Sequence, residues 1–499
     1  MEIELKLACE TDALERFENS VLPLLTNQGI DVERSHAHLY NEYFDTPSEF
    51  FGKRKMGCRV RAKNHEYEQT VKTNGEVTGG LHQRPEYNVK LESPVPDLAK
   101  FPADIWEDSI NIKQVNDELE GLFSTHFERT TFFLSQNDYK MEVVFDFGEV
   151  KRKQDAIPIC EIELELIDGE AIHLFNIASM IVEHIPSRLS DVTKAARGYQ
   201  LLHGNVPEKR SLPAYLKLNE GLSTEDAFCK TISIGLQHWQ YHQHVYSQTN
   251  RLKALLEIRE SLLILLQAVS LYLPVLQCKE LLELHKALLT LNQAWAWQDQ
   301  LESIHRLRSR KGPFSRRIPK NQNLMNYLMG RREGLLNAHK PHELNMSKLS
   351  AKVQLAASRI LIEKPWQMQK SGSEISVKQH ANGWLSQTWQ TVIQSLPADA
   401  SMNENQYVAI EVLLKQSLIN GFMLSGLFAD SWGQFRDPWL DLSSGIVELK
   451  AILLLHEALN DMQVDDKAEF SSWIQDKTHS LIKVMEQTRK VAMGLDTYW

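Results

Sequence analysis

The chain has 499 residues, of which 42% are hydrophobic and 24% charged, and its formal net charge is -10. This length is too great for one ordinary domain and predicts two to four, and the composition is that of a globular protein. The negative charge argues against a general nucleic-acid binder, and the sequence contains neither an apolar run of about 18 residues nor a signal-peptide pattern. The scattered cysteines, without CxxC pairs, fit a reducing compartment. We therefore expect a cytoplasmic protein without nucleic-acid or membrane partners.

The opening residues alternate charged and apolar side chains. Successive side chains of a strand point to opposite faces, so Glu2, Glu4 and Lys6 share one face and the leucines and isoleucine between them the other. Residues 160–166 repeat this pattern with Glu161, Glu163 and Glu165. The alternation predicts further strands, and 3.6-residue periodicity predicts helices over 11–25, 170–184 and the segment of Lys194 and Arg197. The predicted strands between these two repeats are 40–45, 58–63, 66–73, 82–92, 127–134 and 140–147.

Two interpretations explain strands that alternate glutamate with Ile or Leu, because glutamate is a poor strand former. One is an ordinary sheet with a solvated charged face. The other is a barrel with a polar interior and an apolar outside covered by helices. Both signs of charge occur on many of these strands; carboxylates hold hard divalent cations, and Arg and Lys bind phosphate oxygens. We favour the barrel. No GxxxxGK[ST] motif is present, so a triphosphate site would have to be built from side chains.

An ordered set of short motifs spans about residues 1 to 200. The members are Glu2-x-Glu4-x-Lys6, Tyr43-Phe44-Asp45-Thr46, Arg59-x-Arg61, Thr70-Val71-Lys72, Arg84-x-Glu86 and Glu161-x-Glu163-x-Glu165. In this order they resemble the signature of the CYTH family, also called triphosphate tunnel metalloenzymes. The resemblance implies an eight-stranded antiparallel tunnel that hydrolyses or cyclises triphosphates with Mg²⁺ or Mn²⁺.

The resemblance also implies roles for individual residues. The implied phosphate-binding set is Lys6, Arg59, Arg61, Lys72, Arg84, Arg129 and Lys194. The implied metal ligands are Asp146, Glu161 and Glu163, with Glu86 in addition and with Glu2 and Glu4 serving a second metal. Glu2, Glu4 and Lys6 are the implied catalytic residues, since the two glutamates would also hold the attacking water. Phosphoryl transfer needs positioning and charge neutralisation, which cations and metals supply without a covalent nucleophile.

The remaining three hundred residues are expected to be helical. Periodicity lapses around Pro207, Pro213 and Gly221, which indicates a linker. Apolar residues then recur at helical spacing over 227–273, 279–297, 349–362, 408–427 and 446–459. We therefore predict an α+β chain with a tunnel domain over 1–203, a linker over 204–222 and an all-α helical bundle over 223–499.

This bundle resembles the CHAD domain, a helical module linked to polyphosphate binding. His244, Arg251 and Lys253 resemble the basic run of that family, although Ser247 stands where the family has an arginine. Another candidate for polyanion binding is the basic segment that flanks Gly312-Pro313 and contains Arg306, Arg308, Arg310, Lys311, Arg316 and Arg317. A solvated loop is the slightly favoured explanation of this segment.

The sequence therefore predicts a metal-dependent inorganic triphosphatase, with polyphosphate as a second partner through the helices. Thiamine triphosphatase, nucleoside triphosphatase and adenylate cyclase would use the same tunnel. A non-catalytic polyphosphate scaffold is the alternative from another class. The paired glutamates argue against a scaffold, because binding an anion alone needs no acidic ligands.

Overall fold

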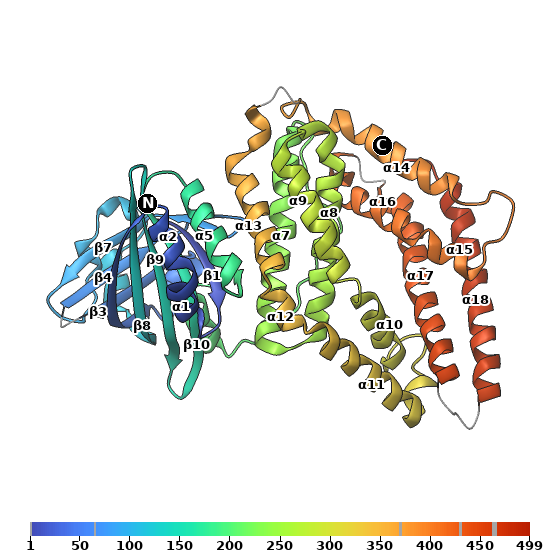
Figure 1. Ribbon diagram of the computed structural model, residues 1–499, viewed down its shortest axis with the longest axis horizontal. Coiled ribbons are helices and arrows are strands. Elements are labelled where there is room, and N and C mark those ends of the chain that lie inside the picture. Colours follow the sequence, from blue (N-terminus) through green and yellow to red (C-terminus); the bar gives the residue numbers. More distant parts are fainter. Residues whose placement is uncertain (1, 64–65, 369–371, 429–431, 462–466) are drawn as a thin grey trace. The chain divides into compact units, whose positions relative to one another are not determined.

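The computed structural model describes residues 2–63, 66–368, 372–428, 432–461 and 467–499 (Figure 1). The chain forms two compact units. The first contains residues Met1–Glu208, Gln240–Arg251 and His342–Glu363, and the second contains Lys209–Trp239, Leu252–Pro341 and Lys364–Trp499. Among the described residues, no helix combines the length and the apolar character that a membrane span would need.

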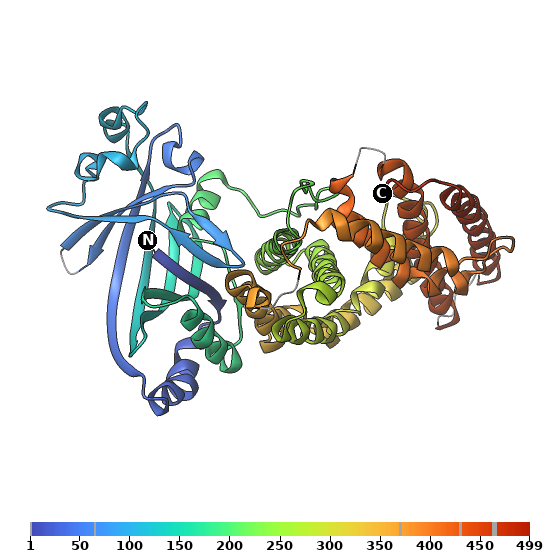
Figure 2. The same cartoon turned by 90° about the horizontal axis from the view of Figure 1, so that it is seen from above.

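The first unit is built on one antiparallel sheet of eleven strands. The strands are β1 (Glu2–Cys9), β2 (Asp31–Asp45), β3 (Gly57–Lys63), β4 (Glu66–Lys72), β5 (Glu76–Thr78), β6 (Leu81–Arg84), β7 (Glu86–Leu91), β8 (Glu120–Gln136), β9 (Tyr139–Arg152), β10 (Asp155–Asp168) and β11 (Ser187–Leu189). Their order is β5-β6-β1-β10-β9-β8-β2-β3-β4-β7, and β11 pairs with β1. Figure 2 shows the curvature of this sheet.

The two ends of the sheet are joined through Pro85. Arg84 pairs with Glu2 of β1, whereas Glu86 pairs with Lys72 of β4. Proline has no N–H to give to a ladder, so the strand divides there into β6 and β7, and its two halves pair with opposite ends of the strand order. The sheet thereby curls on itself and acquires an inner face. Counting β6 and β7 separately, and adding the short β5 and β11, gives eleven strands where the sequence predicts eight.

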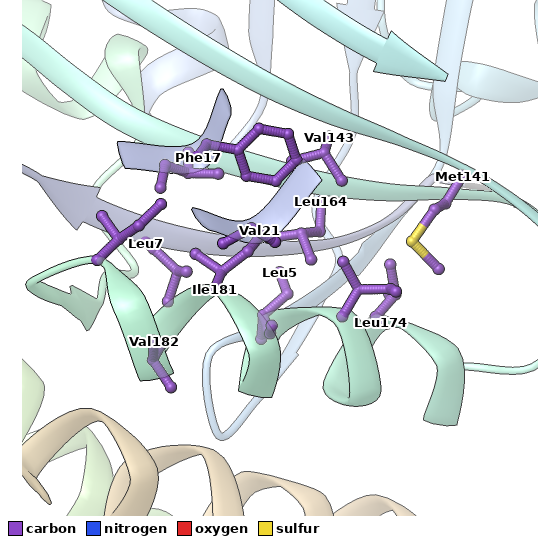
Figure 3. Close-up of a cluster of buried hydrophobic side chains, with 14 of the residues drawn as sticks. Leu5, Leu7, Phe17, Val21, Met141, Val143, Leu164, Leu174, Ile181 and Val182 are labelled. Carbon is purple, nitrogen blue, oxygen red and sulfur yellow. The ribbon is translucent and has the colours of Figure 1, made fainter. Parts of the chain in front are cut away.

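The apolar residues of the alternating strands form the main core, outside the curl of the sheet. Leu5 and Leu7 of β1 and Leu164 of β10 are fully buried there (Figure 3). The covering helices are α1 (Ala13–Arg16), the π-helix η1 (Phe17–Val21), α2 (Leu22–Asn27) and α5 (Ile172–His184). Leu355 of α13 (Lys348–Glu363) belongs to the same core. The opposite, charged face of β1 and β10 is thus directed into the curl.

The first unit has further short helices. They are α3 (Phe50–Lys53), the 3₁₀ helices η2 (Leu98–Lys100) and η3 (Ala103–Ile105), α4 (Ile112–Asp117), α6 (Lys194–His203) and α12 (Pro341–Asn345), whose first residue belongs to the second unit. Helix α7 (Thr224–Thr249) contributes its last ten residues to this unit and its earlier residues to the second unit.

The described secondary structure of the second unit is helical apart from one isolated bridge between Ser223 and Ser376. Its helices are α8 (Leu252–Leu276), α9 (Lys279–Ala294), α10 (Gln298–Arg308), η4 (Ile318–Lys320), α11 (Gln322–His339), η5 (Pro365–Met368), α14 (Val377–Gln394), α15 (Glu404–Ala409), α16 (Glu411–Leu424), η6 (Ser425–Leu427), α17 (Trp432–Asp461) and α18 (Lys467–Met493). The apolar periodicity over 227–273 is interrupted at Asn250, whose φ of 51° ends α7 before α8 begins. The predicted fold class, a curled antiparallel sheet with flanking helices followed by helices, is confirmed.

Candidate active and metal-binding site

Strand register brings the predicted site residues together on the inner face of the sheet. Lys6 of β1 lies opposite Glu163 of β10, while Asp146 of β9 lies opposite both Arg129 of β8 and Glu161 of β10. Because side chains alternate along each strand, the charged residues point inward while their neighbours enter the core. All the predicted site residues except Arg61 belong to one network of contacts no longer than 4.0 Å.

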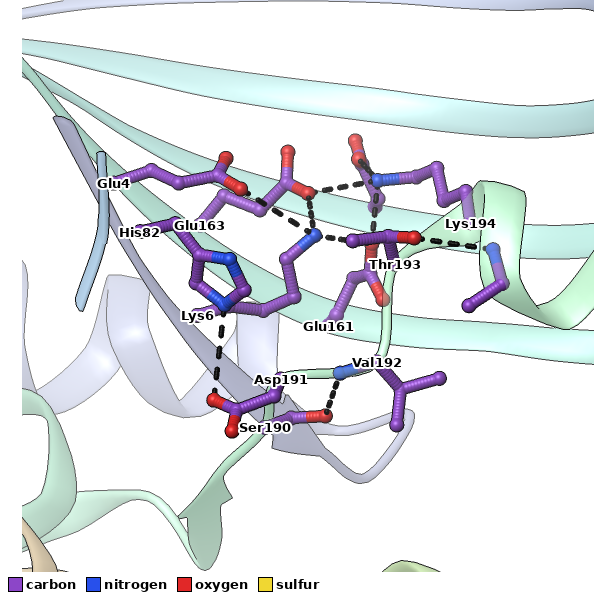
Figure 4. Close-up of polar contacts among 12 residues, drawn as sticks. Glu4, Lys6, His82, Glu161, Glu163, Ser190, Asp191, Val192, Thr193 and Lys194 are labelled. Carbon is purple, nitrogen blue, oxygen red and sulfur yellow. Dashed lines mark hydrogen bonds and ion pairs between the residues drawn. The ribbon is translucent and has the colours of Figure 1, made fainter. Parts of the chain in front are cut away.

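Three buried carboxylates converge at one point of this inner face. Oxygen atoms of Asp146, Glu161 and Glu163 all lie within 4.8 Å of one another. The ammonium of Lys194, from the first turn of α6, lies 2.6 Å from Asp146, 2.5 Å from Glu161 and 3.0 Å from Glu163. Figure 4 shows this ammonium joined by dashed lines to Glu161 and Glu163. The three carboxylates, called the carboxylate trio below, therefore surround a position that a cation occupies.

Two further cations form ion pairs with the carboxylate trio. Lys6 donates to Glu163 at 2.6 Å, and Arg129 makes two hydrogen bonds to Asp146, of 2.8 and 2.6 Å. Burial acts to raise the pKa of Glu163, but Lys194, Lys6 and Arg129 outweigh it and hold that pKa well below its ordinary value. The pKa of Glu161 is likewise lowered, against burial, chiefly by Lys194 and Lys6. Glu161 and Glu163 are therefore held in their ionised form.

A second charged group lies where the sheet curls shut. Lys72 bridges Glu2 and Glu86, at 2.6 and 2.7 Å, and Arg84 contacts Glu2 at 3.4 Å and Glu4 at 3.1 Å. Burial, opposed by Lys72 and supported by Glu4 and Glu86, raises the pKa of Glu2. Burial acts to raise the pKa of Glu4, but Lys6, Lys72 and Arg84 together outweigh it and lower that pKa. Glu2 and Glu86 therefore share a cation, whereas Glu4 lies 4.0 Å from Lys6 and connects this group to the trio.

The two arginines of β3 carry positive charge that few carboxylates balance. Arg59 lies 3.8 Å from Glu86, and Arg61 donates to the neutral amide of Asn41 at 2.8 Å. No described carboxylate lies within ion-pair distance of Arg61. Burial, Arg59 and Arg129 together lower the pKa of Arg61 to about 9. An anion placed beside Arg61 would stabilise its charged form and so raise its pKa again.

Helix α6 fixes the position of Lys194. Thr193 caps the helix by accepting a hydrogen bond from Ala196 N, and Lys194 is the first helical residue after it. One turn later, Gly198 approaches Phe123 of β8 so closely that a Cβ on Gly198 would lie 2.0 Å from the phenyl ring. Glycine at this position lets the helix approach the sheet, and the Lys194 ammonium reaches the trio.

Two inner-face residues were not among the predicted ligands. Arg197, one helical turn after Lys194, lies 2.7 Å from Glu161. Glu165 lies opposite both Glu4 and Glu142, and burial, with Glu2, Glu142 and Glu86, raises its pKa to about 7. The alternation of β10 includes Glu165, so its inward direction was readable from the sequence. Arg197 could be noticed only from its three-residue spacing to Lys194.

Several other charged residues lie outside this network. Asp45 accepts hydrogen bonds from the backbone of Thr46, Phe51 and Gly52 and from the Tyr199 hydroxyl, and it therefore holds the turn after β2. Lys90, Lys151 and Lys153 are exposed. Arg317 of the basic segment pairs with Glu469 at 3.0 Å within the second unit.

The carboxylate trio fits a hard divalent cation. Its donors are all carboxylate oxygens, buried and close enough to share one ion, which is the ligand chemistry that Mg²⁺ and Mn²⁺ prefer. Lys194 already contacts all three residues, so a metal ion and this ammonium would compete for the same oxygens.

Comparison with known proteins agrees with this geometry. Residues 1–199 match the model of the CYTH domain family, and the chain therefore carries a CYTH domain at its N-terminus. The same region is homologous to the inorganic triphosphatase of Haemophilus influenzae, with 36% identity over 202 residues. That alignment covers 40% of this chain and about half, 54%, of the relative.

Solved structures match each part of the chain separately. One is described as a putative adenylyl cyclase from Hippeastrum with a dominant triphosphatase activity; it is 16% identical, with a TM-score of 0.31, and the match covers 40% of this chain and 96% of that one. The other is the CHAD domain of Ricinus communis, 12% identical with a TM-score of 0.41, over 56% of this chain and 95% of that one.

Proposed function

We propose that the CYTH domain of this chain hydrolyses inorganic triphosphate to phosphate and diphosphate in the presence of Mg²⁺ or Mn²⁺. The observation that carries the proposal is that half-buried Arg61 has no described carboxylate partner on an inner face that also holds a buried carboxylate trio. Cations with spare charge fit an anionic substrate, and clustered carboxylates fit a metal. Both are required for phosphoryl transfer without a covalent nucleophile.

The arginines and lysines of the inner face would bind and orient the phosphate groups. Arg61 is held by Asn41, so its guanidinium fork is fixed before substrate arrives. Arg59 stands on the same face of β3. On the adjacent strand β4, Lys72 lies opposite Gly57 and bridges two glutamates. These groups neutralise charge on the phosphate oxygens and hold the substrate in line with a water molecule.

Asp146, Glu161 and Glu163 would hold the metal ion. A divalent ion held by these residues would help to neutralise the charge of the phosphate groups. Lys194 would leave the trio when the ion binds and would then be free to contact a phosphate. Glu4 is ionised and lies beside Lys6, so it can orient a water molecule or accept its proton.

Inorganic triphosphate is favoured over nucleoside or thiamine triphosphates by the relative in Haemophilus influenzae, which is named an inorganic triphosphatase. The inner-face residues described above are charged or amide-bearing. Stacking on an aromatic face, by which proteins commonly recognise a base, is not part of this set. A substrate made only of phosphate groups would use every cation of the network.

The direct test is phosphate release by the full-length protein from inorganic triphosphate, ATP and thiamine triphosphate. We expect fastest release from inorganic triphosphate, complete loss with excess chelator, and recovery with Mg²⁺ or Mn²⁺. Equal rates on ATP and inorganic triphosphate would refute the substrate assignment. Tight binding of triphosphate without release under any metal would instead indicate a non-catalytic phosphate-binding protein.

Two substitutions test the metal-binding part and the phosphate-binding part of the site separately. Glu163→Gln should lower kcat by about a hundredfold or more, because it removes one charge from the trio at nearly constant volume. Arg61→Ala should raise KM, since the unpaired guanidinium is removed. The matched control for Arg61→Ala is Lys63→Ala, which removes an exposed cation from the same face of the same strand. Unchanged KM in Arg61→Ala would remove this residue from the substrate site.

A further inference from the structure

Two arginines of the first unit are buried next to, but outside, the carboxylate trio. Arg188 of β11 and Arg197 of α6 are only 6% and 7% exposed. Arg188 has no described carboxylate within 4.0 Å; its hydrogen bonds go to the backbone oxygen of Leu189 at 3.4 Å and to the Ser247 hydroxyl at 3.5 Å. The Asp191 carboxylate acts on Arg188 electrostatically but lies beyond ion-pair distance. A buried guanidinium that no carboxylate contacts is costly, so Arg188 requires an explanation.

Arg197 is only partly neutralised. Its Nη2 lies 2.7 Å from Glu161, whereas its Nη1 is buried without a hydrogen-bond partner among the described residues. Glu161 is shared with Lys194 and with Lys6, at 2.5 and 3.6 Å. One carboxylate thus serves three cations, and the Nη1 side of Arg197 retains unused donors.

Helix α7 adds a polar stripe to the surroundings of Arg188. Gln240, His244 and Ser247 are spaced i, i+4 and i+7 and therefore lie on one face of the helix. Gln240 is 2% exposed, and neither of its amide atoms has a described hydrogen-bond partner. Burial, then Arg188 and Arg197, lower the pKa of His244 to about 3, so its ring is neutral and can donate one hydrogen bond without adding charge.

We propose that Arg188, Arg197, His244 and Ser247 form a second anion site, which binds a phosphate group next to the carboxylate trio. Two guanidinium groups match the oxygens of a tetrahedral phosphate, and the neutral ring and hydroxyl supply further hydrogen-bonding atoms. The occupant is either free inorganic phosphate or the terminal phosphate of a longer phosphate chain. The site does not contain the trio and binds phosphate whether or not the curled sheet hydrolyses triphosphate.

The test is the rise in the thermal unfolding midpoint of the full-length protein on adding inorganic phosphate or, separately, linear polyphosphate, both with chelator present. The background carries Arg59→Ala and Arg61→Ala, so that binding at the β3 arginines is removed. We expect phosphate to raise the midpoint in this background and Arg188→Gln to weaken the apparent affinity by about tenfold or more. A response to polyphosphate but not to inorganic phosphate would assign the site to chain ends. No response to either would overturn the proposal.

The direction in which Arg188→Gln shifts the unfolding midpoint without phosphate distinguishes a binding role of Arg188 from a structural role. Removing an uncompensated buried charge should leave the phosphate-free midpoint unchanged or raise it, while the phosphate response is lost. A structural arginine predicts the opposite, a lower midpoint and a preserved phosphate response, and that outcome would overturn the proposal. Ser247→Ala and His244→Gln probe the same site from α7 if Arg188→Gln does not fold. Arg34→Gln, on an exposed part of β2, is the control.

Discussion

The ammonium of Lys194 lies 2.5 Å from the carboxylate of Glu161, although one stands on a helix and the other on a strand. Asp146 and Glu163 contact the same ammonium, and these three carboxylates, against the effect of burial, raise the pKa of Lys194. The lysine is therefore charged and holds together carboxylates that would otherwise repel one another. The same three carboxylates are the ligands that a divalent ion would use.

Competition between Lys194 and a metal ion gives the first prediction. Lys194→Met should tighten Mn²⁺ binding in the absence of substrate, because the competing ammonium is gone. It should also lower triphosphatase kcat by about a hundredfold, because the lysine no longer reaches a phosphate. Free Mn²⁺ measured by electron paramagnetic resonance gives the affinity. Lys151→Met, on an exposed side chain, is the control, and weaker Mn²⁺ binding in Lys194→Met would contradict the competition.

The second prediction concerns pH and Glu165. Burial and the neighbouring carboxylates raise the pKa of Glu165 from 4.5 to about 7, so the folded protein favours the neutral side chain. This stabilisation is complete below pH 4.5 and is lost as the pH rises through about 7. Without metal, Glu165→Gln and the wild type should therefore unfold at similar temperatures at pH 5, and Glu165→Gln should unfold at a higher temperature at pH 8. The reverse order at pH 8 would show that ionised Glu165 is stabilised in the fold.

The third prediction tests the approach of α6 to the sheet. Gly198→Ala places a methyl group against Phe123 and must shift the helix, which displaces Lys194 from the trio. We expect kcat to fall at least tenfold while the protein remains folded, since Lys194 touches all three carboxylates. Adding Phe123→Leu makes room for the methyl group and should restore part of the activity. Equal activity in Gly198→Ala and the wild type would mean that α6 tolerates the shift.

The fourth prediction concerns the helical segment that belongs to the first unit. Leu355 of α13 is 3% exposed and packs in the same core as Leu5 and Leu7. Leu355→Ala should destabilise the first unit by about 2–5 kcal/mol, because it leaves a cavity. The measurement is the temperature at which triphosphatase activity is irreversibly lost. The control is Leu282→Ala, on a leucine that is 42% exposed on α9, and equal shifts in the two variants would contradict a role for α13 in this core.

Much of the first unit could be predicted from the sequence, because the alternation of side chains along a strand depends only on neighbouring residues. Alternation along β1 and β10 assigns Glu4 and Glu163 to one face and Leu5 and Leu164 to the other, and the structure places them so. The contacts of Asp45 were harder to predict: an aspartate before Thr-Pro fits both a turn and a tunnel mouth, and only its four hydrogen bonds identify the turn.

The contacts made by Arg188 lay beyond any sequence rule. Its partner Ser247 is 59 residues away on helix α7. The periodicity of α7 is uniform along its length, so nothing in it marks Gln240–Arg251 as part of the first unit. Local patterns specify which face of an element is apolar, whereas the choice of partner depends on the packing of the whole unit.

The discontinuity of the first unit has a consequence during synthesis on the ribosome. Strand β11 is held by bonds from Ser187 N to Met346 O and from Leu189 N to the Gln354 side chain. These partners emerge long after residue 208, so at about 5–20 residues per second the nascent β11 waits roughly ten to thirty seconds for them. An unpaired strand edge invites pairing with other chains. Slower translation over residues 209–341 should therefore lengthen the exposure and increase aggregation of the newly made protein.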